Sequence, residues 1–175
     1  LFFTNNQERM RIDSSGRVMI GTTTEGETGG DQFTVAGSGN TGITIRGGTT
    51  SDTNIFFSDG TSGSDEFRGI IRYQHNSNQL EFFTDASRRM VIDSSGNLGI
   101  GTTSPSSTLD VNGDITISSS HPRIFFTDSN GNPDYLIDVN GGHFLIHDVT
   151  NAADRFKIDS SGNVGIGVTS VSSKL

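Results

Sequence analysis

The sequence contains no cysteine and no tryptophan, and only three of its 175 residues are proline. Without cysteine, the chain can form neither a disulfide scaffold nor a thiolate metal site. It also lacks any apolar run near the roughly 20 residues that a membrane-spanning helix needs, so no membrane insertion is expected. Its 12 Lys and Arg residues are outnumbered by 20 Asp and Glu residues, which gives a net charge of -8. That balance argues against nucleic acid as a partner, because the phosphate backbone selects basic surfaces.

Apolar residues are also scarce. Hydrophobic residues make up 30% of the chain, and the mean hydropathy is -0.35. A lone domain of this length buries roughly 70% of its unfolded surface, and this composition supplies too little apolar material for an ordinary core. Disorder is nevertheless not predicted, because the apolar residues, 12 Phe among them, recur periodically. The composition favours a fold in which further copies of the chain supply the missing contacts.

What the chain does contain is a stretch that occurs three times. Its copies read ERMRIDSSGRVMIGT at 8–22, RRMVIDSSGNLGIGT at 88–102 and DRFKIDSSGNVGIGV at 154–168. Apolar and polar residues alternate on both sides of a turn cluster, the pattern of a β-hairpin with one buried face. The turn glycines Gly16, Gly96 and Gly162 are predicted to have positive φ, which glycine adopts without a Cβ clash. The predicted core positions of the strands are Ile12, Ile20, Met90, Ile92, Leu98, Ile100, Phe156, Ile158, Val164 and Ile166.

A second set of glycines lies inside the hairpin strands. Gly99 and Gly165 leave one strand face bare, as expected where another stretch of backbone approaches closely. The first copy has Met19 at this position, so close approach is not required in every copy.

The copies divide the chain into units. Residues 1–24 match the end of a unit, 25–32 form a Gly-rich connector, 33–104 and 105–170 are two complete units, and 171–175 start a further one. The chain is therefore expected to be a piece of a longer polypeptide. The complete units share matching apolar strand pairs at 33/35 and 109/111, 43/45 and 115/117, 55/57 and 124/126, 71/73 and 135/137, 80/82 and 144/146, 90/92 and 156/158, and 98/100 and 164/166.

The loops between these strands differ, chiefly at 47–54 and 60–68. Hairpin turns are predicted at Asn112-Gly113 and at Asn140-Gly141-Gly142, since Asn-Gly favours the tight turns that join antiparallel strands. No stretch predicts more than about one turn of helix.

The expected fold class is all-β. Successive units meeting end to end would make a rod, and each strand has only one apolar face to bury. Either the chain coils into its own β-solenoid, or several identical chains share one axial core. The low hydrophobic content favours sharing, which predicts elongated, repetitive β-hairpin units.

The runs at 69–113 (GIIRYQHNSNQLEFFTDASRRMVIDSSGNLGIGTTSPSSTLDVNG) and 122–167 resemble the repeats of long tail fibres of bacteriophages, which often precede an endosialidase-type intramolecular chaperone. The resemblance covers essentially the whole chain, and no part of it resembles the chaperone. It implies an intertwined homotrimeric fibre shaft, like a β-prism or a triple β-helix, on a virion. Similar repeats also occur in large bacterial surface proteins and in fibres of prophage origin.

One loop has the spacing of a calcium site. Asp128, Asn130, Asn132 and Asp134 occupy alternate positions, yet Gly stands at position 4 instead of 6 and Val139 stands where a Glu ligand is expected. A plain turn is the favoured interpretation, with these four residues kept as the weak metal candidate. The four histidines show no metal-ligand spacing, although an axial ion shared by three chains needs only one His per chain.

Catalytic patterns are weak. Glycosidases use two carboxylates, and the pairs Asp110/Asp114 and Glu81/Asp85 are of a kind common on any solvated β-surface. No nucleophile elbow of the G-x-S-x-G type occurs. The C-terminal Ser-Lys-Leu matches a peroxisomal address, but SVSSKL at 170–175 aligns with SPSSTL at 104–109 and is the start of the next repeat.

Three function classes follow: the structural shaft of a phage tail fibre, which is favoured; a bacterial extracellular adhesin or surface filament; and a non-catalytic part of a polysaccharide-degrading tailspike. The chain is expected not to be an enzyme, and no cofactor is expected. The expected partners are further copies of the chain as a homotrimer and the neighbouring fibre segments, with a host cell-surface glycan or protein as a further candidate. The expected location is the virion, outside the cell.

Overall fold

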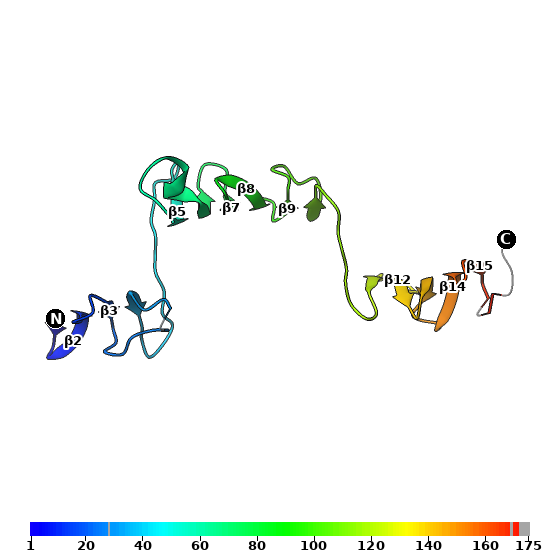
Figure 1. The fold of residues 1–175 in the computed structure, drawn as a ribbon, viewed down its shortest axis with the longest axis horizontal. Helices are drawn as coiled ribbons and strands as arrows, with labels where there is room; N and C mark the ends of the chain where they lie inside the picture. Colours follow the sequence, from blue (N-terminus) through cyan, green and yellow to red (C-terminus); the bar gives the residue numbers. More distant parts are fainter. Residues whose placement is uncertain (28, 169, 172–175) are drawn as a thin grey trace. The chain divides into compact units, whose positions relative to one another are not determined.

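Strands provide nearly all the regular structure of the chain in a computed structural model that describes residues 1–27, 29–168 and 170–171 (Figure 1). These residues form strands β1 to β15 and one short 3-10 helix, η1 (Gly63–Phe67). The chain divides into two compact units, Leu1–Asn112 and Gly113–Leu175. The predicted all-β class is confirmed.

The strands form three sheets, and within each sheet the strands that follow one another in the sequence are hydrogen-bonded to each other. The first sheet contains β1 (Phe2–Thr4), β2 (Gln7–Ile12), β3 (Val18–Ile20) and β4 (Phe33–Val35). The second contains β5 (Asp52–Phe57), β6 (Gly69–Gln74), β7 (Gln79–Thr84), β8 (Ser87–Ile92), β9 (Leu98–Ile100) and β10 (Leu109–Val111). The third contains β11 (Arg123–Phe126), β12 (Tyr135–Asn140), β13 (His143–Asp148), β14 (Ala153–Ile158) and β15 (Val164–Ile166).

The repeated stretch forms the same antiparallel hairpin in all three copies, as β2–β3, β8–β9 and β14–β15. In the second copy Met90 lies opposite Ile100, and Ile92 lies opposite Leu98. This is the pairing that period-two alternation on both sides of the turn at 93–97 predicts.

An aspartate holds each turn. Oδ1 of Asp93 accepts hydrogen bonds from the backbone N–H of Ser95 at 2.8 Å and of Asn97 at 2.9 Å. The bond from the Asn97 backbone is the main reason why the pKa of Asp93 lies below its usual value. Gly96 has a φ of +84°, and the equivalent glycines Gly16 and Gly162 have φ of +80° and +82°. The prediction of positive φ at these three positions is confirmed.

Each copy also contains a β-bulge that the sequence pattern did not predict. The pairing of β7 with β8 shifts at Arg89, which is left as the extra residue. Its carbonyl accepts a hydrogen bond from Gly101 N–H at 2.9 Å, and its Nε donates to Thr84 Oγ1 at 3.0 Å. The same shift occurs at Arg9 and Arg155 in the other copies. A bulge bends the strand that contains it. The bend therefore falls at the same position in all three copies, where β2, β8 and β14 pair with the preceding strand.

The strand that opens each predicted complete unit pairs with the preceding hairpin. β4 lies parallel to β3, with Phe33 beside Val18, and β10 lies parallel to β9, with Leu109 beside Leu98. Hydrogen bonding therefore groups each opening strand with the unit before it, a detail that the repeat boundaries in the sequence do not reveal.

Two segments predicted as strands are not strands in the single chain. Residues 43–45 and 115–117 both read Ile-Thr-Ile, and neither is paired in a sheet of the described chain. The hairpin predicted at Asn112-Gly113 was wrong, because β10 ends at Val111 and no strand follows it until β11. The deviation falls at the same place in both units.

The second predicted hairpin turn is present, whereas one predicted loop has different bounds. The hairpin at Asn140-Gly141-Gly142 joins β12 to β13, with φ of +57° and +81° at its two glycines. The loop predicted at 47–54 is shorter, because β5 begins at Asp52. The predicted start of a further unit at 171–175 lies outside the described residues except for Val171.

Candidate assembly surface

Each sheet carries one face of apolar side chains. Successive side chains of a strand point to opposite sides, and directly opposed residues on neighbouring strands share a face. In the second sheet Ile71 lies opposite both Ile55 and Phe82, and Met90 lies opposite both Phe82 and Ile100. The apolar face of this sheet consists of Ile55, Phe57, Ile71, Tyr73, Leu80, Phe82, Met90, Ile92, Leu98, Ile100, Leu109 and Val111.

The other two sheets repeat this arrangement. In the third sheet Ile137 lies opposite both Ile124 and Ile146, and the rings of Phe144 and Phe156 meet edge to face with centroids 6.4 Å apart. Its apolar face consists of Ile124, Phe126, Tyr135, Ile137, Val139, Phe144, Ile146, Phe156, Ile158, Val164 and Ile166. In the first sheet Phe2, Met10, Ile12, Val18, Ile20, Phe33 and Val35 take the equivalent positions.

These apolar faces are not the buried core of a single chain. Ile12 is 57% exposed, Ile100 is 42% exposed and Ile166 is 70% exposed. Of the other predicted core positions, Ile20 is exposed, and Met90, Ile92, Leu98, Phe156, Ile158 and Val164 are half-buried. A single chain therefore does not bury these predicted core residues completely. Their burial in an assembly of chains stays a prediction.

Most of the buried strand residues lie on the opposite face of each sheet. Val91 and Glu81, which oppose each other on β8 and β7, are both 0% exposed. A Cβ at Gly99 would lie 3.0 Å from the Thr102 carbonyl oxygen and 3.1 Å from Cγ1 of Val91. The chain after β9 therefore packs directly against this face, and the close approach predicted at Gly99 is confirmed. The buried hydrophobic residues of the described chain are Met19, Val91, Leu136 and Leu145.

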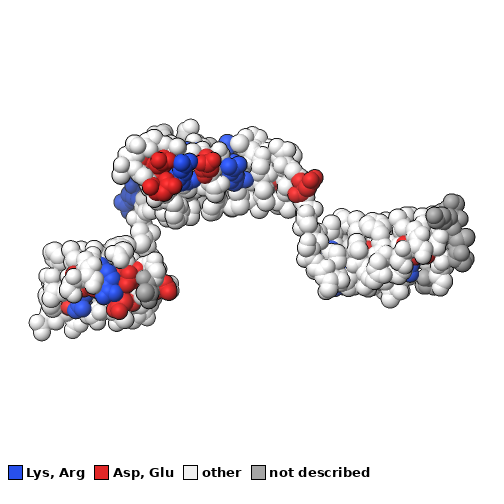
Figure 2. Space-filling model, in the orientation of Figure 1, with Lys and Arg blue, Asp and Glu red and all other residues white. Residues whose placement is uncertain are grey.

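Two arginines balance the charge of Glu81. Nε of Arg72 donates to Oε2 at 2.5 Å, and Nη1 of Arg88 donates to Oε1. The Arg72 guanidinium also lies 4.7 Å from the centroid of the Phe83 ring, in cation–π geometry. Acidic and basic side chains are intermixed on the surface of the compact unit Leu1–Asn112 (Figure 2). A carboxylate bonded on both oxygens keeps its hydrogen bonds without water, so this face is satisfied within one chain.

The equivalent face of the third sheet carries histidines. His121 Nε2 lies 2.5 Å from Asp138 Oδ1, and His147 Nδ1 lies 2.8 Å from Asp154 Oδ1. Leu145, on β13, takes the place that Glu81 has on β7. The sequence did not predict this grouping, because the partners come from different strands and meet only through the strand register. Within the described part of the chain, no group of three or more His, Cys, Asp or Glu side chains is arranged to hold a metal ion.

A further buried carboxylate closes the end of β13. Asp148 is 0% exposed and accepts hydrogen bonds from the Asn151 N–H at 2.9 Å and from Arg155 Nε at 3.0 Å. Burial raises the pKa of Asp148, but the hydrogen bonds from Asn151 and Arg155 outweigh that effect and lower the pKa to about 2. Arg155 is the bulge residue of this copy, so the ion pair links the bulge to the neighbouring strand end.

Three side-chain oxygens of the calcium-type loop accept hydrogen bonds from within the chain. Asp134 Oδ1 accepts from the Asp128 N–H at 2.8 Å, and Asp128 Oδ1 accepts from the Asn130 N–H at 3.1 Å. Asn132 Oδ1 accepts from the Thr150 hydroxyl at 3.3 Å. These bonds order the connection between β11 and β12.

No protein-family model matches the chain, and no curated protein matches its sequence. Among the described residues, no helix is both long enough and apolar enough to cross a membrane. The assignment of function therefore rests on the chemistry of the two faces of each sheet.

Proposed function

We propose that this chain is a shaft segment of a bacteriophage tail fibre, a structural part of the virion that takes part in attachment to the bacterial host. Its first partners are identical chains, three of which would form the shaft with their apolar faces turned towards a common axis. The role is structural and not catalytic. The observation that carries the proposal is the exposed apolar face on each sheet, opposite a face on which Met19, Val91, Leu136 and Leu145 are buried by the same chain.

The energetic argument concerns apolar area. Burial stabilises by roughly 25 cal/mol per Å² of apolar surface, and monomeric soluble proteins rarely expose contiguous apolar patches larger than a few hundred Å². Here Ile55, Phe57 and Tyr73, which lie on one apolar face, are 47%, 56% and 37% exposed. Association of identical chains through these faces would remove that surface from water in every repeat. Successive repeats would then lengthen the shaft.

Attachment would fall to the loops and to the closed polar faces, which remain outside such a core. Loops tolerate change better than packed strands. A weak contact between one loop and a host-surface glycan or protein would be repeated in each chain of the trimer, and multivalent engagement raises the overall affinity well above that of one contact.

Sedimentation combined with light scattering tests the assembly. The expected mass is three times the 18.6 kDa of one chain. Neighbouring residues on β5 provide a matched pair of variants: Ile55 lies on the apolar face and Phe56 on the opposite one, and their exposures in the single chain are similar, 47% and 55%. We expect Ile55→Asn to weaken the trimer at least tenfold and Phe56→Asn to leave it unchanged.

A wild-type chain that sediments as an 18.6 kDa monomer would overturn the proposal. Equal loss of assembly in both variants would show that the apolar face is not the surface through which the chains associate. Circular dichroism of each variant confirms that the strands are retained, so that loss of mass cannot be ascribed to unfolding.

A further inference from the structure

The two Ile-Thr-Ile segments are both outside the sheets of the described chain. Residues 43–45 and 115–117 each follow the parallel strand that closes one sheet and precede the first strand of the next. Neither segment has a backbone hydrogen bond to another part of the described chain. An unpaired run of N–H and C=O groups beside apolar side chains is a template for pairing with another strand.

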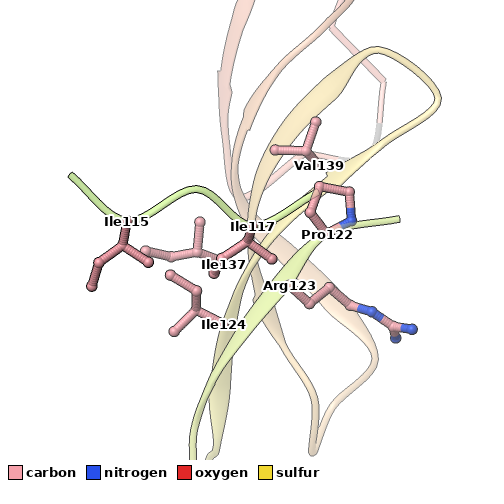
Figure 3. Close-up of a pocket in the computed structure, with 7 residues that line it drawn as sticks. All are labelled: Ile115, Ile117, Pro122, Arg123, Ile124, Ile137 and Val139. Atoms are coloured by element: carbon pink, nitrogen blue, oxygen red, sulfur yellow. The ribbon is translucent and has the colours of Figure 1, made fainter. Parts of the chain in front are cut away.

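The isoleucines of these segments lie close to the apolar faces. Ile115 and Ile117 line a mostly apolar hollow with Pro122 and with Arg123, Ile124, Ile137 and Val139 of the third sheet (Figure 3). In the first unit Ile45 lines the corresponding hollow with Ile55, Ile71, Tyr73 and Leu80. The contacts are partial, since Ile43 and Ile115 remain 67% and 66% exposed. Each segment therefore touches the apolar face at one side while its backbone stays unpaired.

We infer that residues 43–45 and 115–117 are exchange strands, which pair with the sheet edge of a second copy of this chain. The inference rests on the proposed function and deepens it by naming the segments that tie the chains together. Addition of a strand to an open edge uses main-chain hydrogen bonds for affinity and alternate side chains for register. The alternating isoleucines would then continue the apolar face of the neighbouring chain.

A second copy is the occupant that the chain itself indicates. The same tripeptide stands at the same place in both complete units, so the complementary surface must also recur along the partner with the spacing of the repeats. This chain itself carries that spacing, and its sheets end in strands with a free edge, such as β5 and β11. An unrelated partner would have to reproduce the repeat by coincidence.

Hydrogen–deuterium exchange of the assembled protein tests the inference. We expect the amides of 43–45 and 115–117 to exchange at least tenfold more slowly in the assembly than the amides of Thr61 and Ser62, which precede η1. Rapid exchange at both segments, in a protein that sediments at three chain masses, would overturn the inference and leave the proposed function standing. A protein that sediments as a monomer would overturn both.

Proline variants with matched alanine controls give a second test. Thr44→Pro together with Thr116→Pro removes one N–H from each segment, whereas the corresponding alanine variants keep it. Because these amides have no partner in the single chain, the sheets should keep their β-signal in circular dichroism. We expect the double proline variant to lose at least tenfold in assembly affinity and the double alanine variant to match the wild type. A double proline variant that assembles like the wild type would refute the inference.

Discussion

Glu81→Gln removes the charge at the centre of the polar face with little change in side-chain volume. The carboxylate is fully buried and accepts hydrogen bonds from Arg72 on one oxygen and from Arg88 on the other. Glutamine keeps one acceptor oxygen, but its NH₂ group then faces a guanidinium, so a donor meets a donor. One arginine thereby loses its partner at a position that neighbouring side chains cover.

The expected loss follows from burial. Removing one partner of a buried ion pair costs about 3 to 5 kcal/mol. Arg72 and Arg88 are each 25% exposed, so water recovers part of the lost interaction. We therefore expect the free energy of unfolding to fall by about 3 kcal/mol, which lowers the melting temperature by roughly 6 to 12 °C for a chain of this size.

Thermal unfolding followed by circular dichroism measures this change, with the oligomeric state checked in both proteins. Asp85→Asn is the matched control: Asp85 Oδ1 lies 2.7 Å from Arg68 Nη1, but its side chain is 75% exposed, so its loss should cost about 0.5 kcal/mol or less. Equal melting temperatures for Glu81→Gln and the wild type would refute the assignment of a buried ionic centre. Replacing Arg72, Glu81 and Arg88 together by leucine should cost less than Glu81→Gln alone, because no buried charge then lacks a partner; Asp52, which also pairs with Arg72, is 35% exposed and stays in contact with water.

Three further predictions concern the turns, the pH response and a loop. Gly96→Ala should lower the free energy of unfolding by about 1 kcal/mol, because φ is +84° there. Ala86→Gly, at φ +53°, should raise it by about 0.5 to 1 kcal/mol. Urea unfolding measures both changes. Because the pKa of Asp148 is lowered to about 2 in the folded chain, its contribution to stability is fully present above the ordinary aspartate pKa of about 4 and is lost as the pH falls towards 2. Asp148→Asn should flatten the fall in unfolding free energy over that interval. Replacing residues 61–66 by a short Gly/Ser turn should leave the sedimented mass unchanged; a monomer would place this loop in the interchain contact.

The turns and most strands were predictable because neighbouring residues determine them. Asp93, Ser95 and Gly96 meet within one turn, so their hydrogen bonds and the positive φ follow from the sequence cluster alone. Period-two alternation then sets the register of the hairpin on both sides of the turn. The same local chemistry gives the same result in all three copies.

The buried face was not predictable, because alternation marks the apolar side of a strand and not the side that the chain covers. Glu81 reads as a solvent-exposed residue until the strand register brings Arg72 and Arg88 to it from the two neighbouring strands. The bulge at Arg89 depends on the pairing of two strands in the same way. In both features the interacting residues lie on different strands, so they come together only when the strands pair in the sheet.

The two departures from the predicted pattern have one physical explanation. A chance error in reading the strands would fall at different places in the two complete units, yet both units leave the Ile-Thr-Ile segment unpaired and the apolar face exposed. The opposite face behaves differently, because its charged groups change from the Arg72–Glu81–Arg88 cluster in the second sheet to the His121–Asp138 pair in the third. Side chains that must fit a neighbouring chain are restricted to one pattern, whereas side chains that face outward need only satisfy one another. Repetition on one face and variation on the other are therefore what the proposed assembly of identical chains through the apolar face would require.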